Sequence, residues 1–357
     1  MSDLERERTN QSVEEAQTDA AARRAGGEFV RGVSGFRDAL GTAGFPAERG
    51  RYHLFVALNC PWCHRVTIAR NVLGLQDSIT IDIAFPNRTD ENDPAGPNRW
   101  EFNPARIATL TGTTLPECTA ETATGKGFRL AKQIYEEEGS DETSLPILYD
   151  KKSKRIVSNE SAEIVRMLNA QASPLGSRLS DAERPNLYPS GAEHAQLRAE
   201  IDALNETVYV NINNGAYKAG FSSDQAVYAK AFESYFAALD TLEAHLADGR
   251  PFLTGSRFTE ADLRLFPTLY RHDPVYFLRM KLNGARILDY PHLWRWLCRV
   301  HAMPGVAESG SLIHCRQGYF GRSWNNVVPL GPIRPMTYPE AYAHPELADT
   351  DGFHDQA

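Results

Sequence analysis

Residues 60–65 read Cys60-Pro61-Trp62-Cys63-His64-Arg65, and they follow a mostly apolar run at 53–58. Such a run predicts a strand that is buried on both faces. Proline is favoured at the first position of a helix, and apolar residues then recur at helical spacing until Gly74, which predicts a helix over 62–73. The alternating segment 79–85 predicts a second strand. This strand–helix–strand order indicates a parallel β-α-β unit.

The two cysteines of this segment fall in the first turn of the predicted helix. Free backbone N–H groups and the helix dipole stabilise a negative charge there, so they lower the pKa of a thiol and raise its thiolate fraction. The pKa of Cys60, which lies at or near the N-cap, should be lowered most, and Cys63 lies one turn later. Because C-x-x-C on a β-α-β unit is a known redox arrangement, we predict that Cys60 is a nucleophile and Cys63 its candidate resolving partner. The alternative is that both are small apolar residues that fill a helix start.

The composition of the chain indicates a soluble globular protein rather than a nucleic-acid-binding or membrane protein. The 357 residues are 42% hydrophobic and carry a formal net charge of -8, whereas nucleic-acid binding favours a basic face. No apolar run approaches the roughly 18 residues that cross a bilayer, and residues 1–27 lack the apolar core of a signal peptide. The five cysteines do not suggest a disulfide framework. We therefore expect a cytoplasmic protein that binds neither nucleic acid nor a membrane.

Two cofactor interpretations share the cysteine residues. Cys60 to His64 fit C-x-x-C-H, the haem c attachment pattern, but the preceding buried strand and the expected cytoplasmic location argue against it. A structural zinc site needs about four ligands. The remaining candidates are far apart in sequence, with no second closely spaced pair, so we expect no metal and expect each of them to be a buried or incidental residue: Cys118, Cys298, His314 and Cys315.

The rest of the first half completes a thioredoxin-like pattern. Residues 86–127 form a long insertion rich in Pro, Asn, Thr and Gly, and a helix follows at 128–138. Two strands are predicted at 145–149 and 154–157, and then a helix at 158–168. Proline inside a strand is confined to edges or special turns. Pro146, opposite a strand-to-helix cysteine, therefore suggests the cis-proline of thioredoxin-like folds.

A second candidate site lies at the start of the 158–168 helix. Ser158-Asn159-Glu160-Ser161 supplies free backbone N–H groups, a carboxylate and a hydroxyl. A carboxylate suits an α-ammonium, and a helix N-terminus suits a carboxylate. The segment fits plain helix capping equally well, but its expected position beside Cys60 favours binding of a peptide-like thiol.

The second half of the chain is predicted to be all-helical. Amphipathic patterns cover 195–212, 222–247, 259–280 and 291–302, and no strand pattern is convincing. Thr259 and Asp262 have the form of a capping box. Asn213-Asn214-Gly215 suggests a break near the site. We expect an arm and wrapping segment at 1–50, a thioredoxin-like domain at 51–175, a helical domain at 190–325 and a tail at 326–357.

Several longer segments carry a family resemblance. The motifs Cys-Pro-Trp, Leu-Pro and Asn-Glu-Ser follow one another along the chain in the order found in glutathione transferases. Together with these motifs, the longer segments resemble the glutathionyl-hydroquinone reductases, the xi class of glutathione transferases, over about residues 51–332. The chain departs from the family at Cys63, where Ala is usual, and in an insertion around 104–127. The segments are Arg51-Tyr52-His53-Leu54, Asn213-Asn214-Gly215-Ala216-Tyr217-Lys218-Ala219-Gly220-Phe221, Thr259-Glu260-Ala261-Asp262-Leu263-Arg264-Leu265-Phe266-Pro267-Thr268-Leu269, Asp273-Pro274-Val275-Tyr276 and Val327-Val328-Pro329-Leu330-Gly331-Pro332.

The resemblance implies a glutathione-transferase fold, a thioredoxin-like α/β domain followed by an all-α domain. It implies a reductase in which Cys60 removes the glutathionyl group from a quinone-like aromatic conjugate as a mixed disulfide, which a second glutathione then releases. Glutathione is the implied co-substrate, and members are typically homodimers. The residues implied to hold glutathione are Trp100, the backbone of Leu145, Glu160 and Ser161, with Lys132 or Arg129 as the basic group; Tyr217, Tyr276 and Tyr319 are implied to line the aromatic pocket.

Two other functions remain open at this point. A glutaredoxin-like oxidoreductase would cycle Cys60 and Cys63 through an internal disulfide. A non-catalytic thioredoxin-like binding protein would show an ordinary thiol pKa at Cys60 and no adduct with a small thiol.

Overall fold

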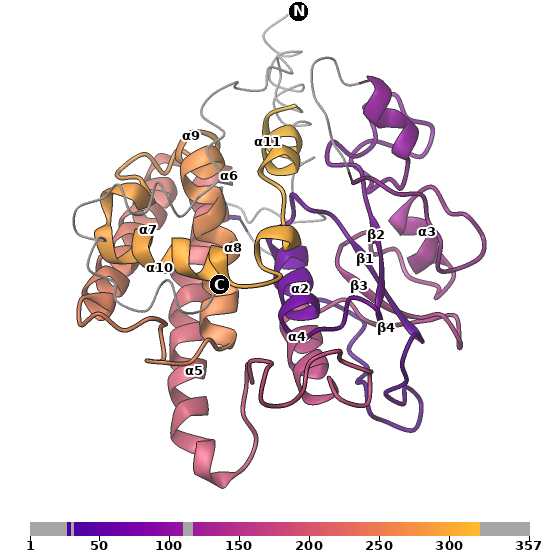
Figure 1. Cartoon of the computed structure of the whole chain (residues 1–357). Helices are drawn as coiled ribbons and strands as arrows, with labels where there is room; N and C mark the ends of the chain where they lie inside the picture. Colours follow the sequence, from indigo (N-terminus) through magenta and orange to yellow (C-terminus); the bar gives the residue numbers. More distant parts are fainter. Residues whose placement is uncertain (1–26, 30–31, 110–116, 322–357) are drawn as a thin grey trace, which may run out of the picture.

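The computed structural model describes residues 27–29, 32–109 and 117–321 (Figure 1). Almost all of the predicted arm at 1–27, the centre of the insertion, the tail at 326–357 and the segment 327–332 lie outside the described residues. Within them, an α/β half contains the sheet and a second half is helical, as predicted. The exact domain boundaries stay a prediction. In the described part of the chain, no helix is both long enough and apolar enough to cross a membrane.

A four-stranded mixed sheet forms the centre of the first half. The strands lie in the order β2-β1-β3-β4; β1 and β2 are parallel, and the other neighbours are antiparallel. The inner strand β1 is buried at all five positions, as expected for a strand covered on both faces. The predicted β-α-β unit is confirmed. The first three strands are shorter than the patterns suggested, and the fourth has the predicted length but is shifted by one residue: β1 (Tyr52–Val56), β2 (Thr80–Ile83), β3 (Ile147–Asp150) and β4 (Arg155–Ser158).

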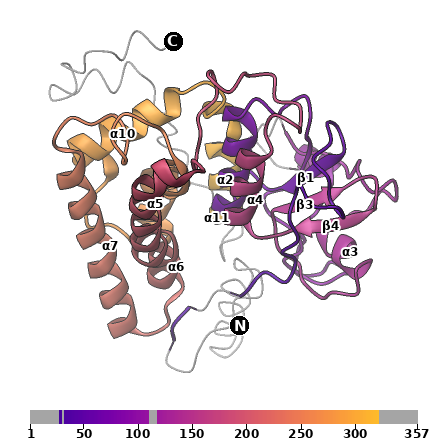
Figure 2. The ribbon, with the colours of Figure 1, turned by 90° about the horizontal axis from the view of Figure 1, so that it is seen from below.

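Helices cover both faces of this sheet. Helices α2 (Pro61–Val72) and α4 (Ser161–Ala170) lie between the sheet and the helical half, and α3 (Ala131–Glu136) lies on the other side (Figures 1 and 2). α3 is shorter than the predicted 128–138 because Leu130 is extended and forms a single β-bridge with Glu101. Glu101 also bridges Phe85, so the described ends of the insertion are attached to the sheet side of the molecule.

The helical half departs from its prediction in three places. The expected break at 213–215 is wrong: the chain stays helical through a π-helical segment, because the Asn213 amide turns inward and donates to the Thr268 hydroxyl at 2.8 Å. The predicted 259–280 helix is divided by a second π-helical segment. A last helix was not predicted. The elements are α5 (Ala195–Thr207), η3 (Val208–Asn213), α6 (Asn214–Phe221), α7 (Gln225–Leu246), α8 (Glu260–Arg271), η4 (His272–Tyr276), α9 (Phe277–Arg279), α10 (Pro291–Ala302) and α11 (Leu312–Phe320).

The last helix, α11, escaped prediction because it has no polar face. All of its residues except Ile313 are buried, and they include His314, Arg316 and Gln317. A helix that is buried all round loses the 3.6-residue alternation of apolar and polar residues on which the pattern depends.

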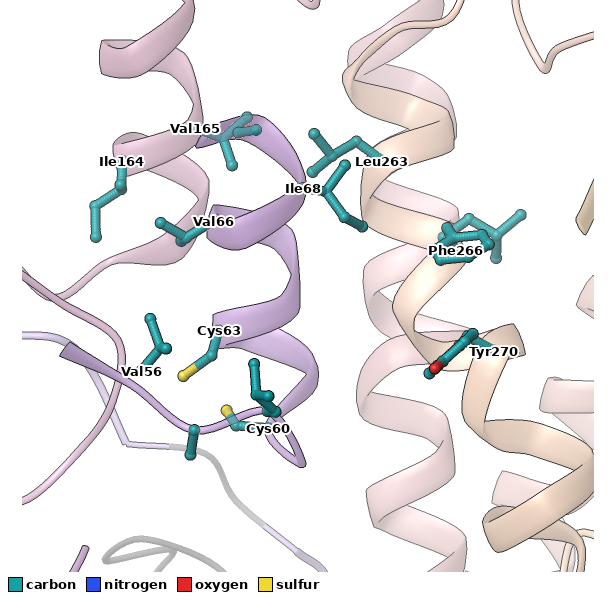
Figure 3. Packing of buried hydrophobic residues seen from close by; sticks show 14 of the residues in the cluster. Val56, Cys60, Cys63, Val66, Ile68, Ile164, Val165, Leu263, Phe266 and Tyr270 are labelled. Carbon is teal, nitrogen blue, oxygen red and sulfur yellow. The ribbon is translucent and has the colours of Figure 1, made fainter. Parts of the chain in front are cut away.

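The predicted capping box at the start of α8 is confirmed and extends beyond the local chain. The buried Asp262 carboxylate accepts the Thr259 N–H at 3.0 Å, the Leu253 N–H at 2.8 Å and the Trp296 indole N–H at 2.8 Å. Burial raises the pKa of Asp262 to about 6, and these hydrogen bonds act against that rise. One carboxylate therefore fixes the start of α8 to the preceding loop and to α10. The two halves then pack through α2 and α8, where Ile68 faces Leu263 (Figure 3).

Candidate active site

Cys60 occupies the N-cap of α2, as predicted. Its backbone is extended (φ -81°, ψ 123°) and Pro61 begins the helix. The Cys60 Sγ atom lies 3.8 Å from the carbonyl oxygen of Leu145, the residue before Pro146. The Leu145–Pro146 peptide is cis, which confirms the predicted cis-proline. The first turn of a helix and a backbone carbonyl from the neighbouring strand entry thus meet at one thiol.

A cavity of about 220 Å³ opens at this thiol between the two halves. Cys60, Pro61 and Trp62 contribute the start of α2, and residues 142–146 and 159–161 contribute the opposite part of the α/β half. The helical half supplies aromatic side chains. The remaining lining residues are Phe29, Gly32, Val33, Ser34, Asn59, Arg88, Trp100, Tyr209, Tyr217, Gly318 and Tyr319.

Four residues that were predicted to hold a thiol ligand line this cavity together: Trp100, Leu145, Glu160 and Ser161. Glu160 is the N-cap of α4, and its Oε1 accepts the Ala162 N–H at 3.0 Å. Its Oε2 accepts the Ser34 hydroxyl at 3.3 Å. The capping and cavity-lining interpretations of Glu160 therefore both describe its position, and its role toward a ligand stays a prediction.

The basic residue at the cavity differs from the two that the sequence suggested. Lys132 lies outside the lining, and its ammonium pairs with Glu136 at 2.8 Å. Arg129 pairs with Asp93 at 2.7 Å and with Glu101 at 2.8 Å, and it too is absent from the lining.

Arg88 takes this place at the cavity wall. Its guanidinium lies over the Trp100 ring, 3.8 Å from the ring centroid, which is a cation–π distance. Arg88 follows β2, whose carboxyl end lies at the same edge of the sheet as the end of β1, beside Cys60. The sequence could have indicated Arg88 by this position just after a predicted parallel strand, because ligands of open α/β sheets bind outside the carboxyl ends of the strands.

The predicted tyrosines form one hydrogen-bonded cluster. The Tyr217 and Tyr319 hydroxyls lie 2.7 Å apart, and the Tyr276 hydroxyl lies 3.3 Å from that of Tyr319. Tyr217 and Tyr319 line the cavity, whereas Tyr276 lies behind Tyr319 and outside the lining. Burial raises the pKa of Tyr276 and of Tyr319 well above the ordinary value. These phenols therefore keep their protons at neutral pH and are able to donate hydrogen bonds.

Two further aromatic residues of the cavity were missed by the sequence predictions. Trp62 and Tyr209 line it with ring centroids 6.0 Å apart in an edge-to-face arrangement. Tyr209 lies in the π-helical segment η3, where the sequence pattern continued as an ordinary helix.

Cys63 is fully buried and lies on the side of α2 that faces the sheet, beside Val56 and Val66 (Figure 3). Its resolving role stays a prediction. The three distant cysteines are buried, as expected, and burial raises the pKa of Cys118 to about 12 and that of Cys315 above its ordinary value.

The haem interpretation conflicts with the environment of His64. This side chain is buried, and both ring nitrogens are used: Nδ1 lies 2.9 Å from Arg271 Nη1, and Nε2 lies 3.0 Å from the Ser309 hydroxyl. An axial haem ligand needs a free ring nitrogen, so His64 does not fit that role. Among residues 27–29, 32–109 and 117–321, no group of three or more His, Cys, Asp or Glu side chains is arranged to hold a metal ion.

Comparisons with known proteins agree with this geometry. Family models described as glutathione S-transferase, N-terminal domain and glutathione S-transferase, C-terminal domain match residues 59–171 and 225–299. The chain is 38% identical over 318 residues to glutathionyl-hydroquinone reductase PcpF of Sphingobium chlorophenolicum, covering 87% of this chain and 92% of that protein. It is also 38% identical to glutathionyl-hydroquinone reductase YqjG of Escherichia coli K12, covering 86% and 88%.

Solved structures give the same result. The glutathione-bound structure of Escherichia coli YqjG superposes with a TM-score of 0.72 at 37% identity, covering 84% of this chain and 94% of that one. The glutathione S-transferase Xi of Phanerochaete chrysosporium superposes with a TM-score of 0.76 at 33% identity, covering 90% and 98%. The likeness therefore extends over both halves of the molecule.

Proposed function

The chain belongs to the glutathionyl-hydroquinone reductases, the xi class of glutathione transferases, and from this premise we propose how its own residues carry out the reaction. It is an enzyme with a glutathione-transferase fold that removes the glutathionyl group from hydroquinone conjugates in a thiol-dependent reaction. The finer assignments that follow, from individual residues to cellular location, are our proposals.

The conjugate would bind in the cavity, with its glutathionyl part against the residues of the α/β half and its ring against the residues of the helical half. Glu160 would pair with the α-ammonium, and the N-terminus of α4 at Ser161 would bind the neighbouring carboxylate. The Leu145 backbone would hold the peptide part in an extended conformation, next to the thiol it already contacts at 3.8 Å. Arg88, stacked on Trp100, would supply the positive charge that we first assigned to Lys132.

The first chemical step forms a disulfide and breaks a thioether bond. The Cys60 thiolate attacks the glutathionyl sulfur, and an S–S bond forms as the bond from that sulfur to the ring carbon breaks. The electron pair of the broken bond stays on the ring carbon, which takes up a proton and becomes the C–H of the free hydroquinone. The ring is reduced by two electrons, and the two sulfur atoms are oxidised to the disulfide.

The tyrosine cluster would serve the ring in this step. Tyr217 and Tyr319 line the cavity and their hydroxyls are hydrogen-bonded to each other, and the Tyr276 hydroxyl lies 3.3 Å from that of Tyr319. Because burial raises the pKa of Tyr319, its phenol stays protonated and is able to donate a hydrogen bond to a ring oxygen that gains electron density. The stability of that oxygen anion or keto form makes the carbon a better leaving group.

The second step restores the enzyme. A second glutathione thiolate attacks the mixed disulfide at the glutathionyl sulfur, releases oxidised glutathione and regenerates the Cys60 thiolate. The helix N-terminus that stabilises the attacking thiolate in the first step also makes Cys60 a good leaving group in the second.

The observation that carries this proposal is the position of Cys60. It lies at the N-cap of α2, in a cavity that is lined on one side by Leu145, Glu160 and Ser161 and on the other by Tyr217 and Tyr319. Cys60→Ser should abolish reductase activity without unfolding the protein. Cys298→Ser is the matched control, because Cys298 is buried in α10 and outside the cavity.

Mass spectrometry of wild type after exposure to conjugate should find one glutathionyl adduct, on the peptide that contains Cys60. Retention of activity within a few-fold of wild type in Cys60→Ser would refute the assignment. If circular dichroism showed that Cys60→Ser had lost its secondary structure, the loss of activity would reflect unfolding and not the loss of the nucleophile.

We also propose a cytoplasmic location, as the composition suggested, and a homodimer, as the family resemblance implied. The cytosol keeps glutathione reduced, which the second step requires. Analytical ultracentrifugation would test the dimer, and a single species at the 39.8 kDa mass of one chain would contradict it.

A further inference from the structure

A fully buried arginine lies directly beneath the loop that presents Cys60. Arg271, the last residue of α8, belongs to the helical half, yet its guanidinium reaches the α/β half. Its Nη2 donates to the Leu58 carbonyl at 3.0 Å, and its Nε donates to the Asn59 carbonyl at 3.2 Å. These are the two residues that precede Cys60, so one side chain of the helical half holds the backbone that ends at the nucleophile.

The other N–H groups of Arg271 have neutral partners. Nη1 donates to the Pro267 carbonyl at 2.8 Å and to His64 Nδ1 at 2.9 Å, and the Cys315 thiol donates to the Leu58 carbonyl at 3.6 Å, the same carbonyl that Arg271 binds. A guanidinium only donates, so His64 Nδ1 accepts, and the proton of the imidazole lies on Nε2, toward Ser309 at 3.0 Å. Burial, and then the charge of Arg271, lowers the pKa of His64 well below its ordinary value. His64 is therefore neutral.

No carboxylate balances the charge of Arg271 within the described residues. The ionisable groups nearest to it are His64 from α2, Tyr270 from α8, Tyr276 from η4, and Cys315 and Tyr319 from α11. All of them are neutral at pH 7. A buried cation without a counter-ion is costly, because its hydrogen bonds replace only part of the hydration that it loses. An anion formed nearby would recover part of that cost.

We propose that Arg271 is a positioning residue for Cys60: it is the buried counter-charge of the Cys60 thiolate, and it fixes the Leu58 and Asn59 carbonyls just before the nucleophile. The proposal rests on the proposed function of Cys60 and deepens it. The positive charge is hydrogen-bonded to the peptide unit that joins Asn59 to Cys60 and is shielded from solvent, so salt screens it little. Since Arg271 belongs to α8, the helical half that binds the ring also sets the reactivity of the thiol.

Other charges face Cys60 from the cavity. Glu142 and Glu160 line it and would oppose a thiolate, whereas Arg88 lines it and would favour one. Arg88 is displaced or neutralised when a glutathionyl carboxylate binds, but Arg271 remains, because no part of it reaches the cavity lining. The two arginines are therefore separable by experiment.

The test is the pH dependence of Cys60 alkylation in the ligand-free enzyme. Iodoacetamide reacts with the thiolate, and mass spectrometry of the Cys60 peptide separates its rate from that of the other cysteines. Wild type should show an apparent pKa well below the ordinary thiol value of about 8.5, with little change between low and high salt. Arg271→Gln should raise this pKa by about one unit, so that the alkylation rate falls about tenfold at pH values well below the wild-type pKa.

Two further variants complete the design. Asp262→Asn is the matched control: Asp262 is equally buried in the same helix and supports the fold, but it contacts no part of the Cys60 loop, so its loss should leave the pKa of Cys60 unchanged. Arg271→Lys keeps the charge and loses the fork of hydrogen bonds. It should keep the pKa of Cys60 within about half a unit of wild type while lowering the melting temperature.

The outcomes are distinct. An unchanged pKa of Cys60 in a folded Arg271→Gln variant overturns the proposal, and so does an equal rise in Asp262→Asn. If Arg271→Gln does not fold, wild type and Arg271→Lys decide between the outcomes. A pKa of Cys60 near 8.5 in wild type, or an ordinary thiol pKa of Cys60 in Arg271→Lys, overturns the proposal. Alkylation needs no conjugate, so a failure of the proposed reductase activity would not be mistaken for a failure of this inference.

Discussion

Replacement of Glu160 by glutamine separates the two roles that its position suggests. One carboxylate oxygen, Oε1, caps α4 by accepting the Ala162 N–H at 3.0 Å. The other, Oε2, accepts the Ser34 hydroxyl at 3.3 Å at the wall of the cavity. Glutamine keeps a carbonyl oxygen that is able to cap the helix, but it has no charge for an ammonium group. Alanine removes both functions.

The expected magnitudes follow from these contacts. A hydrogen bond between a carboxylate and an ammonium contributes about 1.5–3 kcal/mol in a partly buried site. Its loss in Glu160→Gln should therefore weaken glutathione binding about 10- to 100-fold. The free energy of unfolding should change by less than about 0.5 kcal/mol, because the cap is kept. Glu160→Ala should weaken binding equally and should also lose about 1 kcal/mol of stability with the cap.

Isothermal titration calorimetry with glutathione and urea unfolding measure the two quantities separately. Asp224→Asn is the matched control, since Asp224 caps α7 through the Ala226 and Val227 N–H groups, both at 2.9 Å, and lies outside the cavity. It should change neither quantity. Unchanged glutathione affinity in Glu160→Gln, together with reduced stability in Glu160→Ala, would refute the ligand role and leave Glu160 as a helix cap.

Three other predictions concern the thiol, the fold and the response to acid. Cys63→Ala tests whether Cys63, rather than the external glutathione proposed above, first attacks the mixed disulfide: a resolving Cys63 predicts that the variant accumulates more Cys60 mixed disulfide than wild type and that its turnover depends more steeply on free thiol, because an intramolecular attack is lost; unchanged kinetics, with no internal disulfide in wild type by mass spectrometry, would leave Cys63 as a packing residue. Asp262→Asn should cost about 1–3 kcal/mol in urea unfolding, because its amide NH₂ faces at least one buried N–H donor; a loss below about 0.5 kcal/mol would contradict this. Although burial of Asp150 acts in the opposite direction, hydrogen bonds from Arg51 lower its pKa to about 2, below the unfolded value of about 3.9. Its contribution of about 2 kcal/mol is therefore present above pH 4 and lost as the pH falls from about 4 to 2; acid unfolding of Asp150→Asn should show a stability gap to wild type that closes over this range, and a constant gap would refute the sign.

Local patterns in the sequence were sufficient for the scaffold of the site. The β-α-β unit, the position of Cys60 at a helix N-terminus and the capping box at Thr259 each depend on residues that lie within a few positions of one another. Backbone sterics, helix capping and the burial of an apolar strand act at that range. These predictions were confirmed, with shifts of a few residues at the ends of elements.

The basic residue of the cavity was not predicted correctly from the sequence, and its surroundings show why. Lys132 and Arg129 were chosen by type and approximate position, but both are engaged by acidic neighbours at Glu136, Asp93 and Glu101. Which of several cations remains at a cavity wall depends on the partners that the whole fold brings to each of them. Sequence spacing carries no information about that competition.

The sequence by itself determined the thioredoxin-like scaffold, the position of Cys60 at a helix start and the family, because each is expressed in short motifs. Only the tertiary structure decided the environment of the nucleophile. Arg271 is 211 positions after Cys60, and α11 is a helix with no polar face; neither has a periodic or short-range signal. They meet Cys60 because α8 and α11 pack against the start of α2, and a buried charge acts on whatever the fold places beside it, at any separation along the chain.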